Sequence, residues 1–107
     1  RDAGWPPYTH LAAWRAEAAQ REPAYALLNR VSAIARRAAR AQQAVAILGP
    51  APQAMERKDG RYRAQLLFQS AHRAPLHELV RLTLAELRGS KDARKARWSL
   101  DIDPLEL

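Results

Sequence analysis

Two segments of the chain place apolar residues at the three- and four-residue spacing that gives a helix one buried face. The first runs from Glu22 to Gln42, and Pro23 suits its first helical position. The second runs from Arg73 to Gly89, with Pro75 near its start and the glycine as its end. The expected core positions are Ala24, Leu27, Leu28, Val31, Ile34, Ala35 and Ala38 in the first helix, and Leu76, Leu79, Val80, Thr83, Leu84 and Leu87 in the second.

Four other segments are typical of strands. Leu11, Ala13 and Trp14 predict a short, mostly buried strand, although the alanine-rich continuation could equally extend a helix. Residues 45–48 form a short apolar run that Pro50 and Pro52 interrupt, and prolines of this kind favour a sheet edge. The two remaining strands alternate clearly: Tyr62, Ala64, Leu66 and Phe68 share one face of the third, and Trp98, Leu100 and Ile102 point inward from the fourth.

The order strand, helix, strand, strand, helix, strand predicts the fold class. Right-handed crossovers and short connections favour an α+β domain of the ferredoxin-like split βαβ type, with a four-stranded antiparallel sheet and two helices on one face. The second and fourth strands are then the edges. Residues 1–107 fit a single domain. Because the chain starts with Arg1 and lacks a signal-peptide pattern, we expect a piece of a longer soluble protein.

Charge adds a functional class to this picture. The net charge is +7, and residues 30–97 carry fifteen basic against five acidic residues, whereas residues 98–107 carry three acidic residues and no basic one. Such an uneven distribution indicates a polyanionic partner, with nucleic acid the first candidate. The alternative is that arginine only keeps an alanine-rich protein soluble.

The basic residues gather at a predicted hairpin. Asp59-Gly60 is a strong two-residue turn signal, and Arg57, Lys58, Arg61 and Arg63 flank it. Cations on a protruding turn can reach phosphates, and Tyr62 could stack on a base or sugar. The alternative is that charge at an edge strand prevents aggregation. A second candidate cluster comprises Lys91, Arg94, Lys95 and Arg97, which need not lie next to the hairpin tip.

Catalysis and metal binding have little support. The chain has no cysteine, and His72 and His77 do not have the spacing of a zinc pair. Asp101 and Asp103 are expected to be solvated strand residues or partners for nearby arginines. No apolar run approaches the ~20 residues that span a membrane. We therefore expect no enzyme, metal or cofactor in this domain. Arg73 and His77, at the start of the second helix, could instead hold a carboxylate, unless they are only a plain helix start.

Four segments in register resemble one protein family. They are "GWPPYTHLAAWRAEA" at residues 4–18, "ILGPAP" at residues 47–52, "DGRYRAQLLFQ" at residues 59–69 and "RKARWSLDIDP" at residues 94–104. Together they are similar to the C-terminal domain of the bacterial replication-restart helicase PriA (primosomal protein N-prime). An RNA-binding domain of the RRM type shares the strand and helix order, but "RYRAQLLF" lacks its glycine and spaced aromatics.

The resemblance implies a C-terminal domain with a fold similar to a small-subunit ribosomal protein. It implies a cytoplasmic, bacterial, ATP-driven 3′-to-5′ DNA helicase as the parent, with ATP and zinc bound in other domains. This domain would contact single-stranded or forked DNA, and Arg61, Tyr62 and Arg63 match the family's basic-aromatic-basic run. Ala64 departs from it, since the family often has a second aromatic there.

The resemblance also implies an alternative function, a protein-interaction module. Its partners would be the acidic C-terminal tail of single-stranded-DNA-binding protein and other domains of the parent helicase. Arg73 and His77 match the helix start that we connect with the tail, although the family can have Gln in place of the histidine. We expect a monomer and no membrane partner.

Overall fold

The structure, a computed structural model, describes residues 9–39 and 44–104. Its elements follow the predicted order, with one short 3-10 helix added before the last strand. They are β1 (His10–Ala18), α1 (Arg21–Ala38), β2 (Ala46–Lys58), β3 (Arg61–Ser70), α2 (Arg73–Arg88), η2 (Lys91–Arg94) and β4 (Arg97–Ile102).

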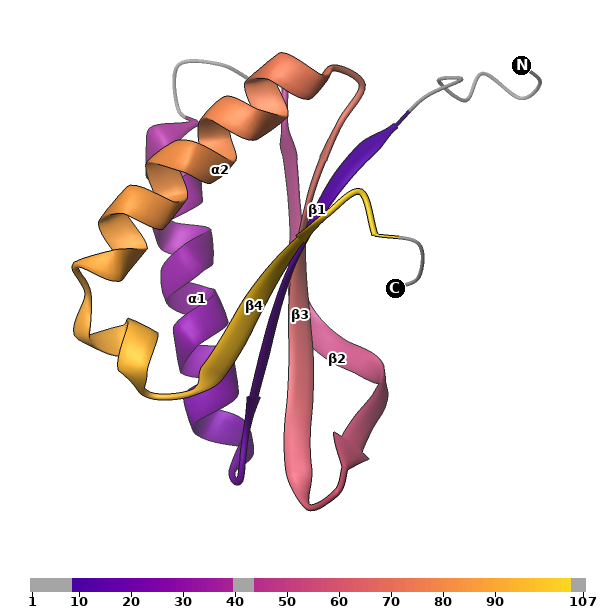
Figure 1. Cartoon of the computed structure of the whole chain (residues 1–107), viewed down its shortest axis with the longest axis vertical. Coiled ribbons are helices and arrows are strands. Elements are labelled where there is room, and N and C mark those ends of the chain that lie inside the picture. Colours follow the sequence, from indigo (N-terminus) through magenta and orange to yellow (C-terminus); the bar gives the residue numbers. More distant parts are fainter. Residues whose placement is uncertain (1–8, 40–43, 105–107) are drawn as a thin grey trace.

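The four strands form one antiparallel sheet of order β2-β3-β1-β4, and both helices cover the same face (Figure 1). The predicted ferredoxin-like split βαβ arrangement is therefore confirmed, with β2 and β4 at the edges. The other face of the sheet carries no helix, and we call it the open face. A site built from strand side chains can reach a large partner on this face, at the two edge strands or at the ends of the strands.

The strand β1 is longer than predicted, because the alanine-rich segment continues it and does not form a helix. Its residues alternate, so that Ala12, Trp14, Ala16 and Ala18 are buried on the helix face. Leu11 and Ala13 belong to the open face; Ala13 is nevertheless fully buried, as predicted, whereas Leu11 is only half-buried. Small side chains let both helices approach this central strand closely, while one tryptophan fills the space between them.

Trp14 organises the core. Its ring lies 5.5 Å from that of Phe68 on β3 and 6.2 Å from that of Trp98 on β4, which joins three neighbouring strands under the helices. Trp14 and Phe68 are fully buried, as predicted, and Trp98 packs against the core with part of its surface exposed. Ile102, predicted to point inward, is 38% exposed because β4 is an edge strand that ends at this residue.

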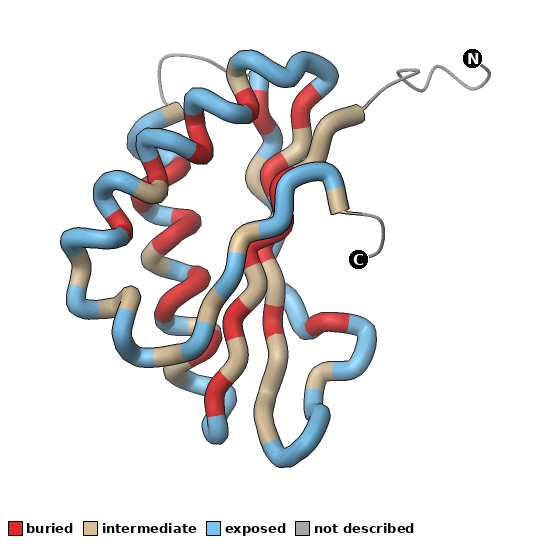
Figure 2. Tube along the Cα trace, in the orientation of Figure 1, coloured by how far each residue is buried: buried red, intermediate tan, exposed pale blue. Residues whose placement is uncertain are grey.

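The helices bury nearly all the predicted positions (Figure 2). Leu84 of α2 is only half-buried, and Ala38 lies exposed in the last turn of α1. Pro23 is the third residue of α1, not the first, because the helix begins at Arg21. Gly89 follows α2 as predicted, but with φ of −88°, so its ending does not require a left-handed residue. The predicted end of the first helix at Gln42 lies outside the described residues.

The sequence suggested that the prolines interrupt the strand β2, but the strand continues past them. It continues to Lys58 through two register shifts against β3, between Leu48 and Ala51 and between Pro52 and Arg57. Gly49 allows the first shift with φ of +104°, a value that L side chains rarely adopt. At the second shift β2 arches away from β3, and Gln53 fills the arch by donating from Nε2 to the Ala64 carbonyl at 3.2 Å. Edge position explains why both irregularities are tolerated.

Candidate nucleic-acid interface

The hairpin of β2 and β3 closes at the predicted turn. Lys58 pairs with Arg61, and the two residues between them, Asp59 and Gly60, have φ of 54° and 76°. Two consecutive positive φ values are those of the tight turn that suits the twist of a hairpin. The tip therefore projects at one end of the sheet, where β1 ends and β4 begins (Figure 1).

The two predicted basic clusters meet at this end through one carboxylate. Glu17, near the end of β1, lies between Arg63 on β3 and Arg97 on β4 in the register of the sheet. Its Oε2 is 3.2 Å from Nη1 of Arg97 and 3.7 Å from Nε of Arg61. The hairpin and the start of β4, which the sequence left unconnected, are thus neighbours. We call this part of the molecule the basic end.

Several cations at the basic end have no acidic partner. Within the described residues, Arg57, Lys58, Lys91 and Arg94 form no ion pair, and all four are exposed. Lys95 is paired with Asp92 through a distance of 3.2 Å. The exposed cations at the hairpin tip and in η2 are therefore available to an anionic partner.

Tyr62 lies on the helix face of β3, as its alternation predicted, and thus on the opposite face from Arg61 and Arg63. The guanidinium carbons of Arg21 and Arg57 are 5.0 and 5.3 Å from the centre of its ring. Arg21 also donates to Glu56 at 3.0 Å, and this hydrogen bond raises the pKa of Arg21. Because cations already contact the ring, a base that stacked on Tyr62 would compete with them or share a face with them. The stacking role of Tyr62 stays a prediction.

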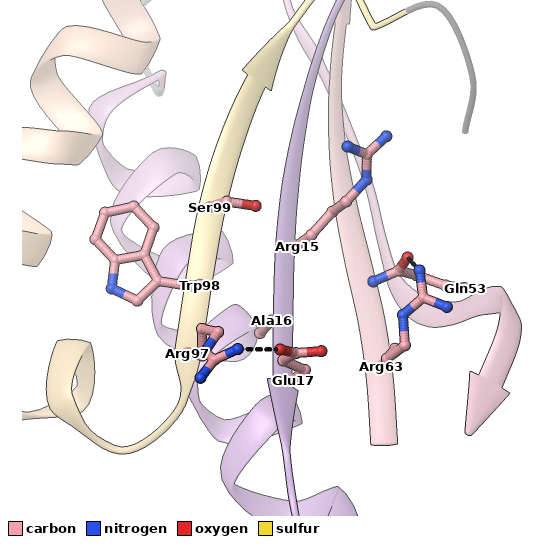
Figure 3. Close-up of a pocket in the computed structure, with 8 residues that line it drawn as sticks. All are labelled: Arg15, Ala16, Glu17, Gln53, Arg63, Arg97, Trp98 and Ser99. Atoms are coloured by element: carbon pink, nitrogen blue, oxygen red, sulfur yellow. Dashed lines mark hydrogen bonds and ion pairs between the residues drawn. The ribbon is translucent and has the colours of Figure 1, made fainter. Parts of the chain in front are cut away.

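An open cavity of about 300 Å³ lies beside the hairpin (Figure 3). The polar and charged side chains that line it come from all four strands and belong to the open face. Trp98 also lines it from the edge strand β4, with its ring turned toward the helices (Figure 3). The lining residues are Arg15, Ala16, Glu17, Gln53, Arg63, Arg97, Trp98 and Ser99. Three guanidinium groups thus share one cavity with a single carboxylate.

Arg63 is held in place by neutral groups. Its Nη2 donates to Oε1 of Gln53 at 2.8 Å, and its Nη1 donates to the Met55 carbonyl at 3.3 Å. No carboxylate pairs with it within the described part of the chain. Gln53 is itself 8% exposed, so the arch of β2 fixes the guanidinium against the sheet. The predicted binding residue is therefore also a structural one.

Sequence reasoning missed four residues of this site, namely Arg15, Glu17, Gln53 and Ser99. The alternation of β1 and β4 carried the signal for three of them, since residues opposite to the buried ones must lie on the open face. Arg15 lies 3.2 Å from Asp101 of β4, as expected for an open-face cross-strand pair. Gln53 had no comparable signal, because its position depends on the arch of β2.

The predicted tail-binding pair lies at the other end of the domain. Arg73 and His77 are exposed and one turn apart at the start of α2. Asp103 belongs to the same end, where its Oδ1 accepts from the Leu11 N–H at 3.0 Å. This hydrogen bond, with smaller contributions from His10 and Arg73, lowers the pKa of Asp103. The two sets of candidate residues therefore occupy separate surfaces.

The described residues, 9–39 and 44–104, form neither a membrane-spanning helix nor a metal-binding cluster. No helix there is long and apolar enough to cross a membrane. No group of three or more histidine, aspartate or glutamate side chains there could hold a metal ion.

The fold defines the class of protein first: a ferredoxin-like α+β domain, which two solved structures share. The de novo designed protein Foldit4 aligns with a TM-score of 0.62 at 12% identity, over 91% of this chain and 98% of that one. The de novo designed protein LFR1 1, which has a ferredoxin fold, aligns with a TM-score of 0.56 at 9% identity, over 89% of this chain and 85% of that one. At such identities the likeness concerns the fold alone.

The sequence then gives the family. The model of the primosomal protein N C-terminal domain matches residues 1–105, so the chain belongs to this family. The resemblance drawn from the four motifs is thereby confirmed. The chain is an accessory domain of a primosomal protein with a role in replication restart, and no catalytic domain is evident in the matched part.

Proposed function

We propose that the domain binds single-stranded or forked DNA during replication restart, with the basic end as its contact surface. The observation that supports this proposal most directly is the meeting of both basic clusters at Glu17, which joins the hairpin to β4. A single strand that followed the hairpin tip toward η2 would meet cations from both clusters.

The physical basis of the proposed binding is electrostatic. Lysine and arginine contacts to phosphates release condensed counterions, and the affinity then falls as salt rises. The arginines that share Glu17 add guanidinium forks, which match phosphate oxygens in geometry. Such contacts carry no sequence information, so binding should depend on the structure of the DNA and not on its sequence.

The test is the salt dependence of binding of a labelled single strand and of a labelled fork, measured by fluorescence anisotropy. Replacing both Lys58 and Arg94 by alanine should flatten the slope of log affinity against log salt by about 1.4, since each phosphate contact to a single strand contributes about 0.7. These two side chains form no ion pair within the described residues, so their loss should leave the fold intact.

The matched control removes two cations elsewhere. Arg37 and Arg81 pair with Glu86 and Glu78 on the helix side of the molecule. Their double alanine variant has the same net charge as the test variant. Equal slopes for the two double variants would refute the assignment to the basic end. A wild-type domain that fails to bind at low salt would refute DNA binding altogether.

A second candidate function is the binding of the acidic C-terminal tail of single-stranded-DNA-binding protein by Arg73 and His77. It is supported by their exposure one turn apart at a helix start, where unpaired N–H groups attract anions. Titration with a short acidic peptide, followed by amide NMR shifts, tests it. Shifts confined to the start of α2 support the tail, whereas shifts at residues 57–63 assign the peptide to the basic end.

The last part of the proposal concerns the activity and location of the parent protein. We infer an ATP-driven helicase of the bacterial cytoplasm, in which ATP and zinc are bound by other domains and this domain acts as a monomer. The support is the family membership alone.

A further inference from the structure

We propose that the cavity on the open face binds a terminal phosphomonoester of a nucleic-acid strand. The inference rests on the proposed function. It goes further because it assigns a terminal phosphate to one cavity, whereas the proposed function requires only contacts to phosphodiesters along the strand. It follows from the charge, the rigidity and the position of the lining residues.

Charge is the first argument. Arg61, Arg63 and Arg97 lie on this part of the open face, and among the described residues they share one carboxylate, Glu17, while the neighbouring Arg15 is paired with Asp101. The excess is two positive charges beside a cavity of about 300 Å³. An internal phosphodiester carries one negative charge, whereas a phosphomonoester carries about 1.5 to 2 at pH 7. The dianion matches the excess better.

Rigidity is the second argument. Two neutral acceptors, Oε1 of Gln53 and the Met55 carbonyl, hold the guanidinium of Arg63 at 2.8 and 3.3 Å. Neither acceptor neutralises its charge. A cation that is fixed before binding loses little conformational entropy when it meets an anion. The Arg63 side chain is therefore prepared for an anionic group at one defined place in the cavity.

Position is the third argument. The cavity opens on the face of the sheet that no helix covers, beside the strands of the hairpin (Figure 3). Ser99 lies opposite Arg15 in the register, so its hydroxyl supplies a neutral donor beside the arginines. A strand held along the basic end could place its last phosphate there.

The experiment compares one oligonucleotide in three forms: with a hydroxyl at both ends, with a 5′-phosphate, and with a 3′-phosphate. Fluorescence anisotropy of an internally labelled 10-mer gives the affinity of each form for the 107-residue chain. We expect one phosphorylated form to bind about tenfold more tightly, the contribution of roughly one charge-assisted hydrogen bond. The preference should shrink at pH 5.5, where the phosphomonoester, whose second pKa is about 6, loses one charge.

The test variant is Ser99→Asp, and its control is Ser99→Asn. Ser99 is exposed on an edge strand, so both substitutions should leave the fold intact. The aspartate adds a carboxylate opposite Arg15 and should abolish the preference for the phosphorylated end, while the asparagine, of the same shape, should keep it. Arg63→Lys, which keeps the charge but loses the fork, should reduce the preference.

The outcomes separate the two proposals. The form with two hydroxyl ends reports DNA binding by itself, so the proposed function can stand while this inference fails. Equal affinity for all three forms, or a preference that survives Ser99→Asp, overturns the inference. Amide NMR with inorganic phosphate provides the last arm. Shifts at Arg15, Arg63 and Ser99 without any preference among the oligonucleotides would mean that the cavity takes a free phosphate, and the assignment to a strand end would be wrong.

Discussion

Replacing Glu17 by glutamine should strengthen DNA binding, although it removes two ion pairs. The carboxylate lies 3.2 Å from Arg97 and 3.7 Å from Arg61, and it offsets part of their charge. A phosphate bound to either arginine would lie about 6 Å from Glu17, and two unit charges at that distance in water repel by about 0.7 kcal/mol. Removing this repulsion raises the affinity about threefold.

The same substitution should have a small cost in stability. The side chains of Arg61 and Arg97 are 37% and 74% exposed, and exposed ion pairs contribute about 0.2 to 1 kcal/mol each. A loss of 1 kcal/mol lowers the melting temperature of a domain of this size by about 4 to 8 °C. The variant should therefore be less stable than the wild type while binding DNA more tightly.

The assay pairs fluorescence anisotropy on single-stranded and forked DNA, across a salt series, with thermal unfolding followed by circular dichroism. Because the substitution frees two arginines, the salt slope for a single strand should steepen by up to about 1.4. Glu78→Gln on α2 is the control: it changes the net charge equally and leaves Arg81 unpaired away from the basic end. A folded Glu17→Gln variant whose affinity is unchanged or reduced would contradict the reasoning, as would an equal gain in the control.

Three further predictions concern the fold. Thr83 is fully buried, and its hydroxyl has no hydrogen-bond partner among the described residues. Thr83→Val should therefore raise the free energy of unfolding by up to about 1 kcal/mol in chemical denaturation, and a loss of stability would refute this reasoning. Gly49→Ala should lower the free energy of unfolding by about 1 to 3 kcal/mol, because φ is +104° and the new Cβ would lie 3.1 Å from the Gln65 carbonyl oxygen. Gly60→Ala, with open space around the new Cβ, should lower it by about 1 kcal/mol, and equal losses for the two variants would refute the role of the close approach. Because the pKa of Asp103 is lowered in the fold, its ionised carboxylate stabilises the folded state above the unfolded pKa of about 3.9, and this stabilisation is lost as pH falls through the folded pKa. The wild type should therefore be more stable than Asp103→Asn at pH 7 and equally stable near pH 2.

The architecture could be predicted because the apolar periods of the chain are clear. The helix faces and the alternation of β3 required only local patterns, and the prolines of β2 correctly placed that strand at an edge. The length of β1 could not be predicted, because alanine suits a helix and a closely packed strand alike. Its burial between two strands and under two helices decided the outcome, and this tertiary environment overrides local propensity.

Individual residues of the candidate site could be predicted, but their grouping into one site could not. The charged positions were visible in the sequence, but their grouping depends on the register that places Glu17 between β3 and β4. The arch of β2, which brings Gln53 back to the sheet and fixes Arg63, has no signature in the sequence beyond the prolines before it. Residues that are far apart along the chain become neighbours through strand pairing, and local patterns in the sequence do not specify the register of that pairing.

The structure also separates two kinds of cation that the sequence could not distinguish. Lys58 and Lys91 are exposed and form no ion pair among the described residues, so they can follow a phosphate backbone and supply a salt-dependent, permissive attraction. Arg63 is fixed by the arch of β2 and directed into a cavity, so it can recognise a group only at one place and in one orientation. Attraction is therefore assigned to Lys58 on β2 and Lys91 in η2, and positioning to Arg63 on β3. A variant that weakens binding uniformly and a variant that changes which DNA end is preferred should accordingly map to different residues.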